Sequence, residues 1–198
     1  MLYNSRTLLR TTLPLNVALV IEEKLMDFVN CTYEHHAIEI LEILNETIIN
    51  STALYDYEPR TIENMTRWFL DKKKGSFPVV GVTDKKGKLM GFASYDTFRA
   101  WPAYKYSVEH CVYIHSDHRG KGIGGKLMEQ LIGIAKQQQY HTMIGGLDIS
   151  NMGSRILHEK LGFVHVGTIN EVAFKFGRWL DLGFYQLILK TPLNPKDG

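Results

Sequence analysis

A run of glycines and basic residues, 119–124 (Arg-Gly-Lys-Gly-Ile-Gly), is the segment of this sequence best suited to chemistry. It lies between an apolar stretch expected to form a strand and an amphipathic stretch expected to form a helix. A helix N-terminus carries unpaired N–H groups and the positive end of the helix dipole, and glycines let a ligand approach the backbone. Arg119 and Lys121 add positive charge. The segment therefore predicts a phosphate-binding turn, although glycines can also mark only a tight strand-to-helix connection.

The same turn contains the spacing Gly120-x-Gly122-x-x-Gly125, which is typical of dinucleotide sites in oxidoreductases. In such sites the glycines belong to a leading βαβ unit, and an acidic residue stands about 20 residues further on. Here they follow antiparallel strands past the middle of the chain, and the nearest acidic candidate, Asp148, is imperfectly placed. The context argues against a nicotinamide site, which is kept as the alternative enzyme class.

Periodicity and turn residues predict the elements that must position this turn. We expect strands at 27–31, 77–82, 89–98, 106–115, 141–149, 163–169 and 184–189, and helices at 36–49, 62–72, 124–138 and 151–161. Thr61 is expected to cap the second helix, and Gly162 to end the fourth. The order β-α-α-β-β-β-α-β-α-β-β predicts an α/β domain with a mixed sheet and helices on its faces.

The length of 198 residues suits one domain, and 44% hydrophobic residues are enough for a core. We expect residues 26–192 to form this domain, 1–25 to be an extension outside the fold, and 193–198 to be a C-terminal tail. The net charge of +2 is too small to indicate a nucleic acid or an anionic membrane as partner. No apolar run approaches the ~20 residues of a membrane span.

The two cysteines, Cys31 and Cys111, stand outside any CxxC pair, and no His/Cys cluster has the spacing of zinc ligands. The adjacent His35 and His36 would point in different directions on a helix and would make a poor metal pair. We therefore expect no metal site, two free thiols and a reducing, cytoplasmic location.

Two blocks of the sequence resemble signatures of one enzyme superfamily. Arg119-x-x-Gly122-x-Gly124 resembles the Q/R-x-x-G-x-G/A turn of the GNAT superfamily, and 151–163 (Asn-x-x-Ser…Leu-His-Glu-Lys-Leu-Gly-Phe) resembles its downstream block. Within that superfamily the sequence looks like phosphinothricin and methionine sulfoximine acetyltransferases over roughly residues 27–190. The segments that carry this narrower resemblance are 45–46, 58–61, 108–114, 117–120 and 175–181.

The resemblance implies a GNAT fold with a mixed, mostly antiparallel sheet, and acetyl-CoA as the co-substrate. It also implies direct acetyl transfer to the α-amino group of a small amino-acid analogue such as phosphinothricin, methionine sulfoximine or methionine sulfone. Such a transfer would detoxify the analogue, and enzymes of this group are usually homodimers. Two alternatives are an acyl-CoA-binding sensor without catalysis and a GNAT enzyme that acts on another amine or on a peptide.

The resemblance also assigns roles to particular residues. Glu109 matches the general base, because an ammonium group must lose a proton before its nitrogen can attack a thioester. His158 stands where many members carry a tyrosine that protonates the departing thiolate. The implied cofactor-binding residues are Val112, Tyr113, Ile114, Arg119, Gly120, Lys121, Gly122, Ile123, Gly124, Gly125 and Asn151. The implied substrate-binding residues are Arg99, Ala100, Trp101, Glu109, His110 and Cys111.

Each assignment has a structural alternative. Glu109 could be an ion-paired glutamate at the edge of a sheet, His158 a helix histidine that only packs, and Asn151 a plain helix cap. Cys111 is expected to be a small buried residue rather than a nucleophile, because no base that would activate it is visible.

The block 175–181 (Lys-Phe-Gly-Arg-Trp-Leu-Asp) is distinctive, but its physical role is open. Lys175 or Arg178 could meet the acidic end of a substrate. Equally, the aromatic residues of the block could shape a dimer contact.

Overall fold

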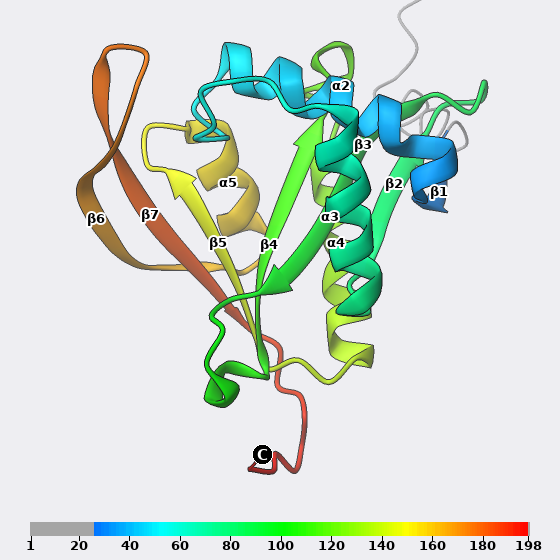
Figure 1. Cartoon of the computed structure of the whole chain (residues 1–198). Helices are drawn as coiled ribbons and strands as arrows, with labels where there is room; N and C mark the ends of the chain where they lie inside the picture. Colours follow the sequence, from blue (N-terminus) through cyan, green and yellow to red (C-terminus); the bar gives the residue numbers. More distant parts are fainter. Residues whose placement is uncertain (1–25, 198) are drawn as a thin grey trace, which may run out of the picture.

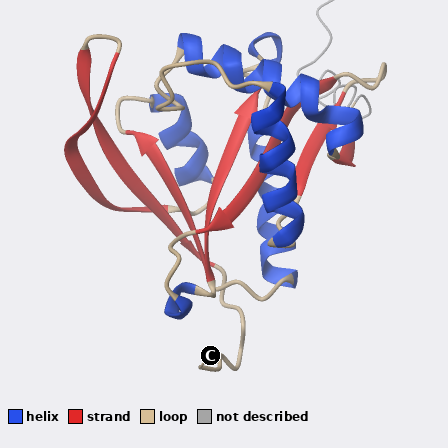
Figure 2. Ribbon diagram, viewed as in Figure 1, coloured by secondary structure: helices blue, strands red, loops and turns tan. Residues whose placement is uncertain are grey.

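The computed structural model describes residues 26–197, so the expected extension 1–25 lies outside the described residues. The described chain forms one seven-stranded mixed sheet with helices packed on it, which confirms the expected fold class (Figures 1 and 2). The strands are β1 (Asp27–Asn30), β2 (Val79–Thr83), β3 (Leu89–Thr97), β4 (Ser107–Ile114), β5 (Thr142–Asp148), β6 (Val164–Lys175) and β7 (Arg178–Ile188). The α-helices are α2 (Tyr33–Asn50), α3 (Ile62–Lys74), α4 (Ile123–Gln137) and α5 (Met152–Lys160), with short 3-10 turns at η1 (Pro102–Tyr104) and η2 (Ser116–His118).

The sheet has the strand order β1-β2-β3-β4-β5-β7-β6, and the β4–β5 pair is its parallel pair. This pair runs only from Ser107↔Thr142 to Glu109↔Ile144. Beyond that point β4 stays paired with β3, and β5 stays paired with β7. The two central strands therefore keep their outer neighbours but lose each other, and Figure 1 shows them diverging.

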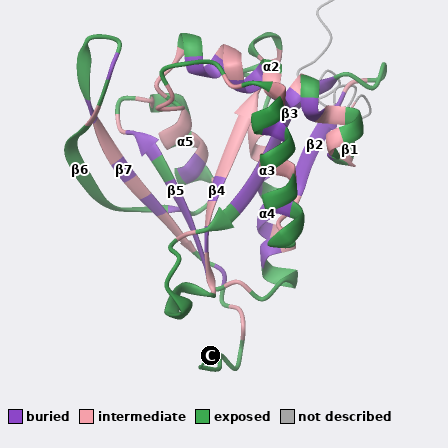
Figure 3. Ribbon diagram, in the orientation of Figure 1, coloured by how far each residue is buried: buried purple, intermediate pink, exposed green. Residues whose placement is uncertain are grey.

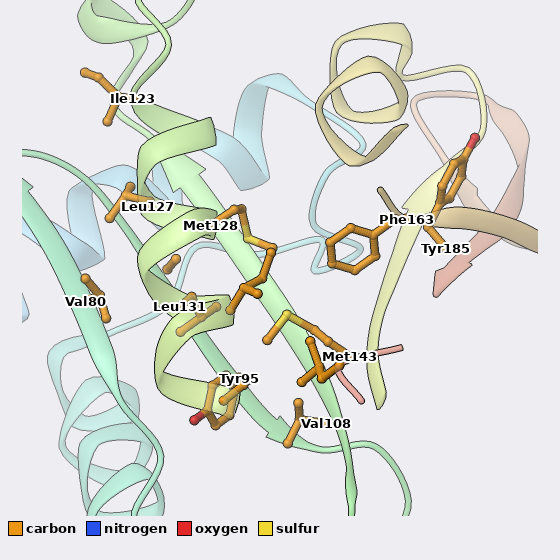
Figure 4. Close-up of a cluster of buried hydrophobic side chains, with 14 of the residues drawn as sticks. Val80, Tyr95, Val108, Ile123, Leu127, Met128, Leu131, Met143, Phe163 and Tyr185 are labelled. Carbon is orange, nitrogen blue, oxygen red and sulfur yellow. The ribbon is translucent and has the colours of Figure 1, made fainter. Parts of the chain in front are cut away.

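Two hydrophobic clusters hold the helices to opposite faces of the sheet. On one face α2 and α3 pack through Ala37, Ile40, Ile43, Leu44 and Met65, which meet Leu89 and Phe92. On the other face α4 packs through Leu127, Met128 and Leu131, which meet Val80, Val108 and Met143 (Figure 4). Burying each of the larger side chains contributes about 1.5–3 kcal/mol, so these clusters hold the helices firmly against the sheet.

Local signals in the sequence explain where several elements begin and end. Thr61 and Asn64 form a reciprocal capping box at the start of α3, as expected from Thr61. Gly162 has a φ of +85° just after α5, which confirms its predicted role at the helix end. The first helix starts at Tyr33 and not at 36, because its first turn packs Tyr33 against Phe69.

The last two strands are longer than expected. We predicted strands at 163–169 and 184–189, but β6 and β7 run to Lys175 and from Arg178, joined at Phe176-Gly177. The segment between the predicted strands lacks a clean apolar alternation, because most of β6 is exposed on both faces (Figure 3). Backbone pairing with β7 holds β6 in place although β6 has no buried face of its own.

None of the helices among the described residues is long and apolar enough to cross a membrane.

Candidate active site

The open edge of β4 is the first feature of the site. From Val108 to Ile114 one edge of this strand is bonded to β3, whereas pairing with β5 ends at Glu109↔Ile144. Alternate residues of an antiparallel strand direct their N–H and C=O groups to opposite edges. Part of the backbone along 112–114 is therefore left for another partner, and these are the three residues assigned to the pantetheine arm.

The glycine turn follows at the end of this edge. Gly120 and Gly122 have φ values of +76° and +77°, and a Cβ at either position would meet nothing within 4 Å. Gly122 is the N-cap of α4 and supplies no side-chain cap, so the first N–H groups of the helix are not satisfied by it. A left-handed backbone, open space and an uncapped helix start together suit an anion.

The two basic side chains of the turn are used within the protein. Arg119 donates from Nε to the Ile114 carbonyl at 3.1 Å, and its guanidinium forms an ion pair with Glu46 of α2. Lys121 donates from Nζ to the Asp117 carbonyl at 2.9 Å. In this arrangement they shape the turn, and the backbone N–H groups are its most direct anion donors.

The remaining assigned cofactor residues lie where α4 meets α5. Ile123 is buried in the core, so it can contribute to a ligand only through its backbone. A Cβ on Gly124 would lie 3.4 Å from Leu157 of α5, and one on Gly125 would lie 3.9 Å from the same side chain. Glycine at these two positions lets the start of α4 lie close to the Leu157 side chain of α5.

Asn151 lies at the start of α5 and acts as its N-cap. Its Oδ1 accepts a hydrogen bond from the Ser154 N–H at 3.0 Å. The plain capping role is thus present, and it leaves the Asn151 amide nitrogen for other partners.

Glu109 lies at the last rung that joins β4 to β5. Its carboxylate makes no hydrogen bond or ion pair with any residue in the range 26–197. Burial raises the pKa of Glu109 above its ordinary value, the nearby charge of Arg99 opposes this, and Asp96 adds to it. A Cβ on Gly146 of β5 would lie 3.1 Å from Glu109 Oε1, so glycine leaves room for the carboxylate. Among the described residues, Glu109 is therefore not the ion-paired glutamate of the structural alternative.

His110, one residue beyond that rung, meets His158 on the opposite face of the sheet. His158 Nδ1 lies 2.7 Å from the Ser154 carbonyl, and the two Nε2 atoms lie 3.1 Å apart. Both rings are buried and pack against Phe163. Burial lowers the pKa of His158, and it lowers the pKa of His110 well below its ordinary value.

The loop assigned to the substrate lies at the start of β4. Arg99 packs over the Phe98 ring at 4.3 Å and donates to the Phe98 carbonyl at 3.0 Å. Trp101 is 75% exposed, so it does not wall a pocket within a single chain. Cys111 shares the Glu109 face and is partly buried, and desolvation raises the pKa of its thiol, which does not favour a nucleophile.

The block 175–181 fastens the β6–β7 hairpin to the loop between α2 and α3. Lys175 Nζ donates to the carbonyls of Ile48, Ser51 and Leu54 at 2.7, 3.0 and 2.6 Å. Its ammonium group is therefore occupied inside the fold and is not free to meet a substrate. The block places its aromatic residues Phe176 and Trp179 on the surface.

Arg178 is held in the same region by a buried carboxylate. It donates to Asp148 at 2.8 Å, and Asp148 also accepts from Thr52 at 2.6 Å and from Ser150. Asp148, the acid considered for a dinucleotide ribose, is thus 99% buried and fully engaged.

Sequence reasoning missed two glycines that the site requires. Gly145 and Gly146 lie in β5 directly after its last rung with β4, on the imidazole face and the Glu109 face respectively. Two consecutive glycines inside a strand signal close approach of another group, and this signal was present in the sequence.

Among residues 26–197 no group of three or more His, Cys, Asp or Glu side chains could hold a metal ion, and Cys31 and Cys111 are both free.

Comparison with known proteins matches this geometry to one family. Residues 38–163 match the sequence profile of the acetyltransferase (GNAT) family. A curated relative, the L-methionine sulfoximine/L-methionine sulfone acetyltransferase of Pseudomonas aeruginosa, is 39% identical over 150 residues, covering 76% of this chain and 87% of the relative. Among solved structures, an N-acetyltransferase from Staphylococcus aureus is 42% identical with a TM-score of 0.81, covering 83% of this chain and 99% of the other.

A second solved structure holds a ligand. The phosphinothricin acetyltransferase of Sinorhizobium meliloti, in complex with acetyl-CoA, is 30% identical with a TM-score of 0.82, covering 87% of this chain and 93% of the other. The chain therefore belongs to the acetyltransferase (GNAT) family and is an acetyltransferase. The oxidoreductase alternative for the glycine turn is wrong.

Proposed function

We propose that the chain moves acetyl from acetyl-CoA to the α-amino group of a small amino-acid analogue, with Glu109 as the general base. The observation that carries this proposal is the state of Glu109: half-buried, raised in pKa, and without a hydrogen-bond or ion-pair partner among the described residues. A carboxylate in that state can accept a proton near neutral pH. The substrates named for the relatives, methionine sulfoximine, methionine sulfone and phosphinothricin, are α-amino acids with a tetrahedral polar tip.

Acetyl-CoA would lie along the open edge of β4 and over the glycine turn. The backbone of 112–114 would pair with the pantetheine arm as an added strand does, and 119–125 would hold the pyrophosphate at the start of α4. Asn151, at the start of α5, would complete the cofactor site. Support comes from the unpaired strand edge and the uncapped helix start, together with the acetyl-CoA in the related structure.

The reaction would proceed by direct transfer. Glu109 takes a proton from the substrate ammonium group, and the free amine attacks the thioester carbonyl. A backbone N–H on the open edge of β4 stabilises the developing oxyanion. The C–S bond then breaks and CoA leaves as the thiol, whose pKa of ~8.5 makes it a tolerable leaving group; His158 would assist its departure.

The substrate would approach from the face of the sheet that carries Glu109 and Cys111. Arg99 lies close enough to Glu109 to influence its pKa, so its guanidinium is the candidate partner for an α-carboxylate. The resemblance assigns Ala100, Trp101 and His110 to the substrate as well, but the buried His110 ring lies on the opposite face of β4 and would not meet a substrate on this side. Trp101 is exposed in the single chain, so we propose that it meets the substrate or the second subunit in the assembled enzyme.

We propose a homodimer formed by a single domain at 26–192, in the cytoplasm, where it would detoxify such analogues. The β6–β7 hairpin exposes a set of apolar side chains that a second copy could cover. They are Val166, Ile169, Val172, Phe174, Phe176 and Trp179. The two free thiols fit a reducing compartment.

A thiol-release assay tests the function. Acetyl-CoA would be offered with phosphinothricin, methionine sulfoximine, methionine sulfone, the common amino acids, a polyamine and a lysine peptide. We expect CoA release with the first three and little with the rest. Release only with the peptide or the polyamine would keep the acetyltransferase but overturn the substrate class. Silence across the panel, with acetyl-CoA still bound, would favour a sensor.

A further inference from the structure

Arg60 is fixed in place at the end of the connection between α2 and α3. Its backbone N–H donates to Asn45 Oδ1 at 2.7 Å, and its carbonyl accepts from Asn45 Nδ2 at 3.0 Å. The next residue, Thr61, is the N-cap of α3 and belongs to the capping box that starts this helix. One side-chain amide of α2 and one helix start therefore hold the backbone from which the Arg60 side chain projects.

This connection lies over the face of the sheet that carries the proposed base. Glu109, Cys111 and Tyr113 are alternate residues of β4, so their side chains share one face. Two apolar residues on either side of the arginine, Leu54 and Ile62, pack on the same hydrophobic cluster as Tyr113. The guanidinium therefore belongs to a segment that covers this face beyond the end of the β4–β5 pairing.

The charge of Arg60 acts on side chains of that face. Burial raises the pKa of the Tyr113 hydroxyl well above its ordinary value, and the charge of Arg60 opposes this rise. Burial also raises the pKa of the Cys111 thiol, and Arg60 again opposes the rise. Because electrostatic interactions weaken with distance, both effects agree with a guanidinium that lies near this part of β4.

Part of the guanidinium is free to bind an anion. Asp56 holds one edge of it, with Nε 3.1 Å from Oδ1 and Nη2 3.2 Å from Oδ2. A guanidinium has five N–H donors, so the edge formed by Nη1 and the second N–H of Nη2 is left without an acceptor among residues 26–197. The Arg60 side chain is 27% exposed, which makes this edge accessible to a solute.

Other cations near this face are engaged more fully or lie elsewhere. Lys72 is buried against a carboxylate of β3, with 2.6 Å between its Nζ and the nearer oxygen. Lys175 donates to three carbonyls, which uses all three of its N–H groups. Arg178 donates to the buried Asp148 at the end of β5. Arg60 is therefore better placed than these three to bind an anion that lies along β4.

We propose that Arg60 determines substrate specificity by binding the polar tip of the amino-acid substrate, and that it favours an anionic tip such as a phosphinate. The inference rests on the proposed function, in which the substrate amine meets Glu109 and the α-carboxylate meets Arg99 at the start of β4. Neighbouring side chains on one face of a strand are about 7 Å apart. A tip joined to the α-carbon by an ethylene linker therefore reaches from Glu109 toward Cys111, on the side where Arg60 lies.

The charge of the tip decides how much this contact contributes. The phosphinate of phosphinothricin is an anion at neutral pH, and its two oxygens match the free edge of a guanidinium. The sulfone of methionine sulfone has the same tetrahedral shape but is neutral. Hydrogen bonds to charged groups contribute more than neutral ones, so the loss of Arg60 should weaken binding of the first substrate more than that of the second.

Kinetics with these two substrates test the assignment. We expect Arg60→Met to raise the KM for phosphinothricin roughly 10- to 100-fold, and the KM for methionine sulfone less than about fivefold, with kcat changed less than about twofold. Arg60→Lys keeps a positive charge, so its KM for phosphinothricin should lie within about fivefold of the wild type. Equal changes for both substrates, or an unchanged phosphinothricin KM in Arg60→Met, would overturn the proposal.

Arg67→Met is the matched control. Arg67 lies exposed on α3, so this variant removes the same charge from the same region without touching the proposed subsite. Both KM values should stay within about twofold of the wild type, because salt screens exposed charges. A rise in the phosphinothricin KM as large as that in Arg60→Met would show an effect of overall charge and would refute the assignment.

Calorimetry gives a reading that does not depend on turnover. When phosphinothricin is titrated into enzyme loaded with CoA, its affinity should be roughly 10- to 100-fold weaker for Arg60→Met than for the wild type. Equal affinities would overturn the role of Arg60.

Methionine sulfone separates the two possible failures. If Arg60→Met turns it over normally, the variant is folded and the proposed function holds, so an unchanged phosphinothricin KM rejects Arg60 alone. If the wild type releases CoA with neither substrate, the proposed function fails, and the inference fails with it.

Discussion

The two faces of β4 place two neighbouring residues in different surroundings. Glu109 and His110 are consecutive, and burial shifts both pKa values toward the neutral form. On one face the Glu109 carboxylate has no hydrogen-bond or ion-pair partner among the described residues. On the other face His110 is held through His158 to the backbone of α5.

The difference separates a group that must change its protonation state from a group that must keep it. A carboxylate without fixed partners can gain and lose a proton with little reorganisation of its surroundings. An imidazole held by a second imidazole keeps one tautomer, because the alternative would set a bare nitrogen against a carbonyl oxygen. The following predictions test this contrast.

Removing the base should have the largest effect. Glu109→Gln keeps the shape of the side chain but cannot accept the amine proton, so kcat should fall roughly 10²-fold or more. Binding of acetyl-CoA, measured by calorimetry, should survive. Near-normal turnover would remove Glu109 from the mechanism. Neither face of β4 would then hold a group that must change its protonation state.

Adding a methyl group on either face of β5 should affect the imidazole face more. In Gly145→Ala the new Cβ would clash with both Nε2 atoms, so we expect kcat to fall about tenfold and stability to fall by about 1–3 kcal/mol. Gly146→Ala is the matched partner, because its Cβ would lie 3.1 Å from the mobile end of Glu109. It should cost only a few-fold in kcat. Equal losses of melting temperature and of kcat in Gly145→Ala and Gly146→Ala would contradict the predicted difference between the two faces.

The pH profile should report Glu109 and not the imidazoles. Because burial raises the pKa of Glu109, kcat/KM should fall on the acid side at a pH above the ordinary glutamate range. The ionised form is the active one, so activity is lost as pH decreases through that pKa. Glu109→Gln should lose this acid limb, whereas His110→Phe should keep it at the same pH. An unchanged limb in Glu109→Gln would assign it to another group.

A smaller shift should follow from removing the nearest cation. The positive charge of Arg99 lowers the pKa of Glu109, so Arg99→Met should raise it and move the acid limb to higher pH. We expect kcat/KM to fall more on the acid limb of the pH profile than on its plateau. A uniform loss across the whole profile would indicate that Arg99 acts only by binding the substrate.

Local patterns predicted the elements well, and long-range contacts were not predictable. Thr61 marks the start of α3 through its side-chain cap, and Gly162 marks the end of α5 through its positive φ. The order of strands and helices follows from the periodicity of apolar residues. Glu109 was found because its family resemblance and its chemistry agree.

The pairing of His110 with His158 joins residues 48 positions apart, and Arg119 with Glu46 joins residues 73 apart. Nothing in either local sequence specifies such a partner. The hairpin was missed for a related reason, since most of β6 is exposed on both faces and therefore shows no apolar alternation.

Lys175 joins the β6–β7 hairpin to the connection between α2 and α3 by hydrogen bonds. Its single ammonium group bonds three carbonyls around the connection between α2 and α3, and Tyr57 of that connection bonds the Phe174 carbonyl in return. A change in the length of either segment would therefore be felt in the other. Variants that change the length of the α2–α3 connection should therefore change the hairpin with it, because the two segments share these hydrogen bonds.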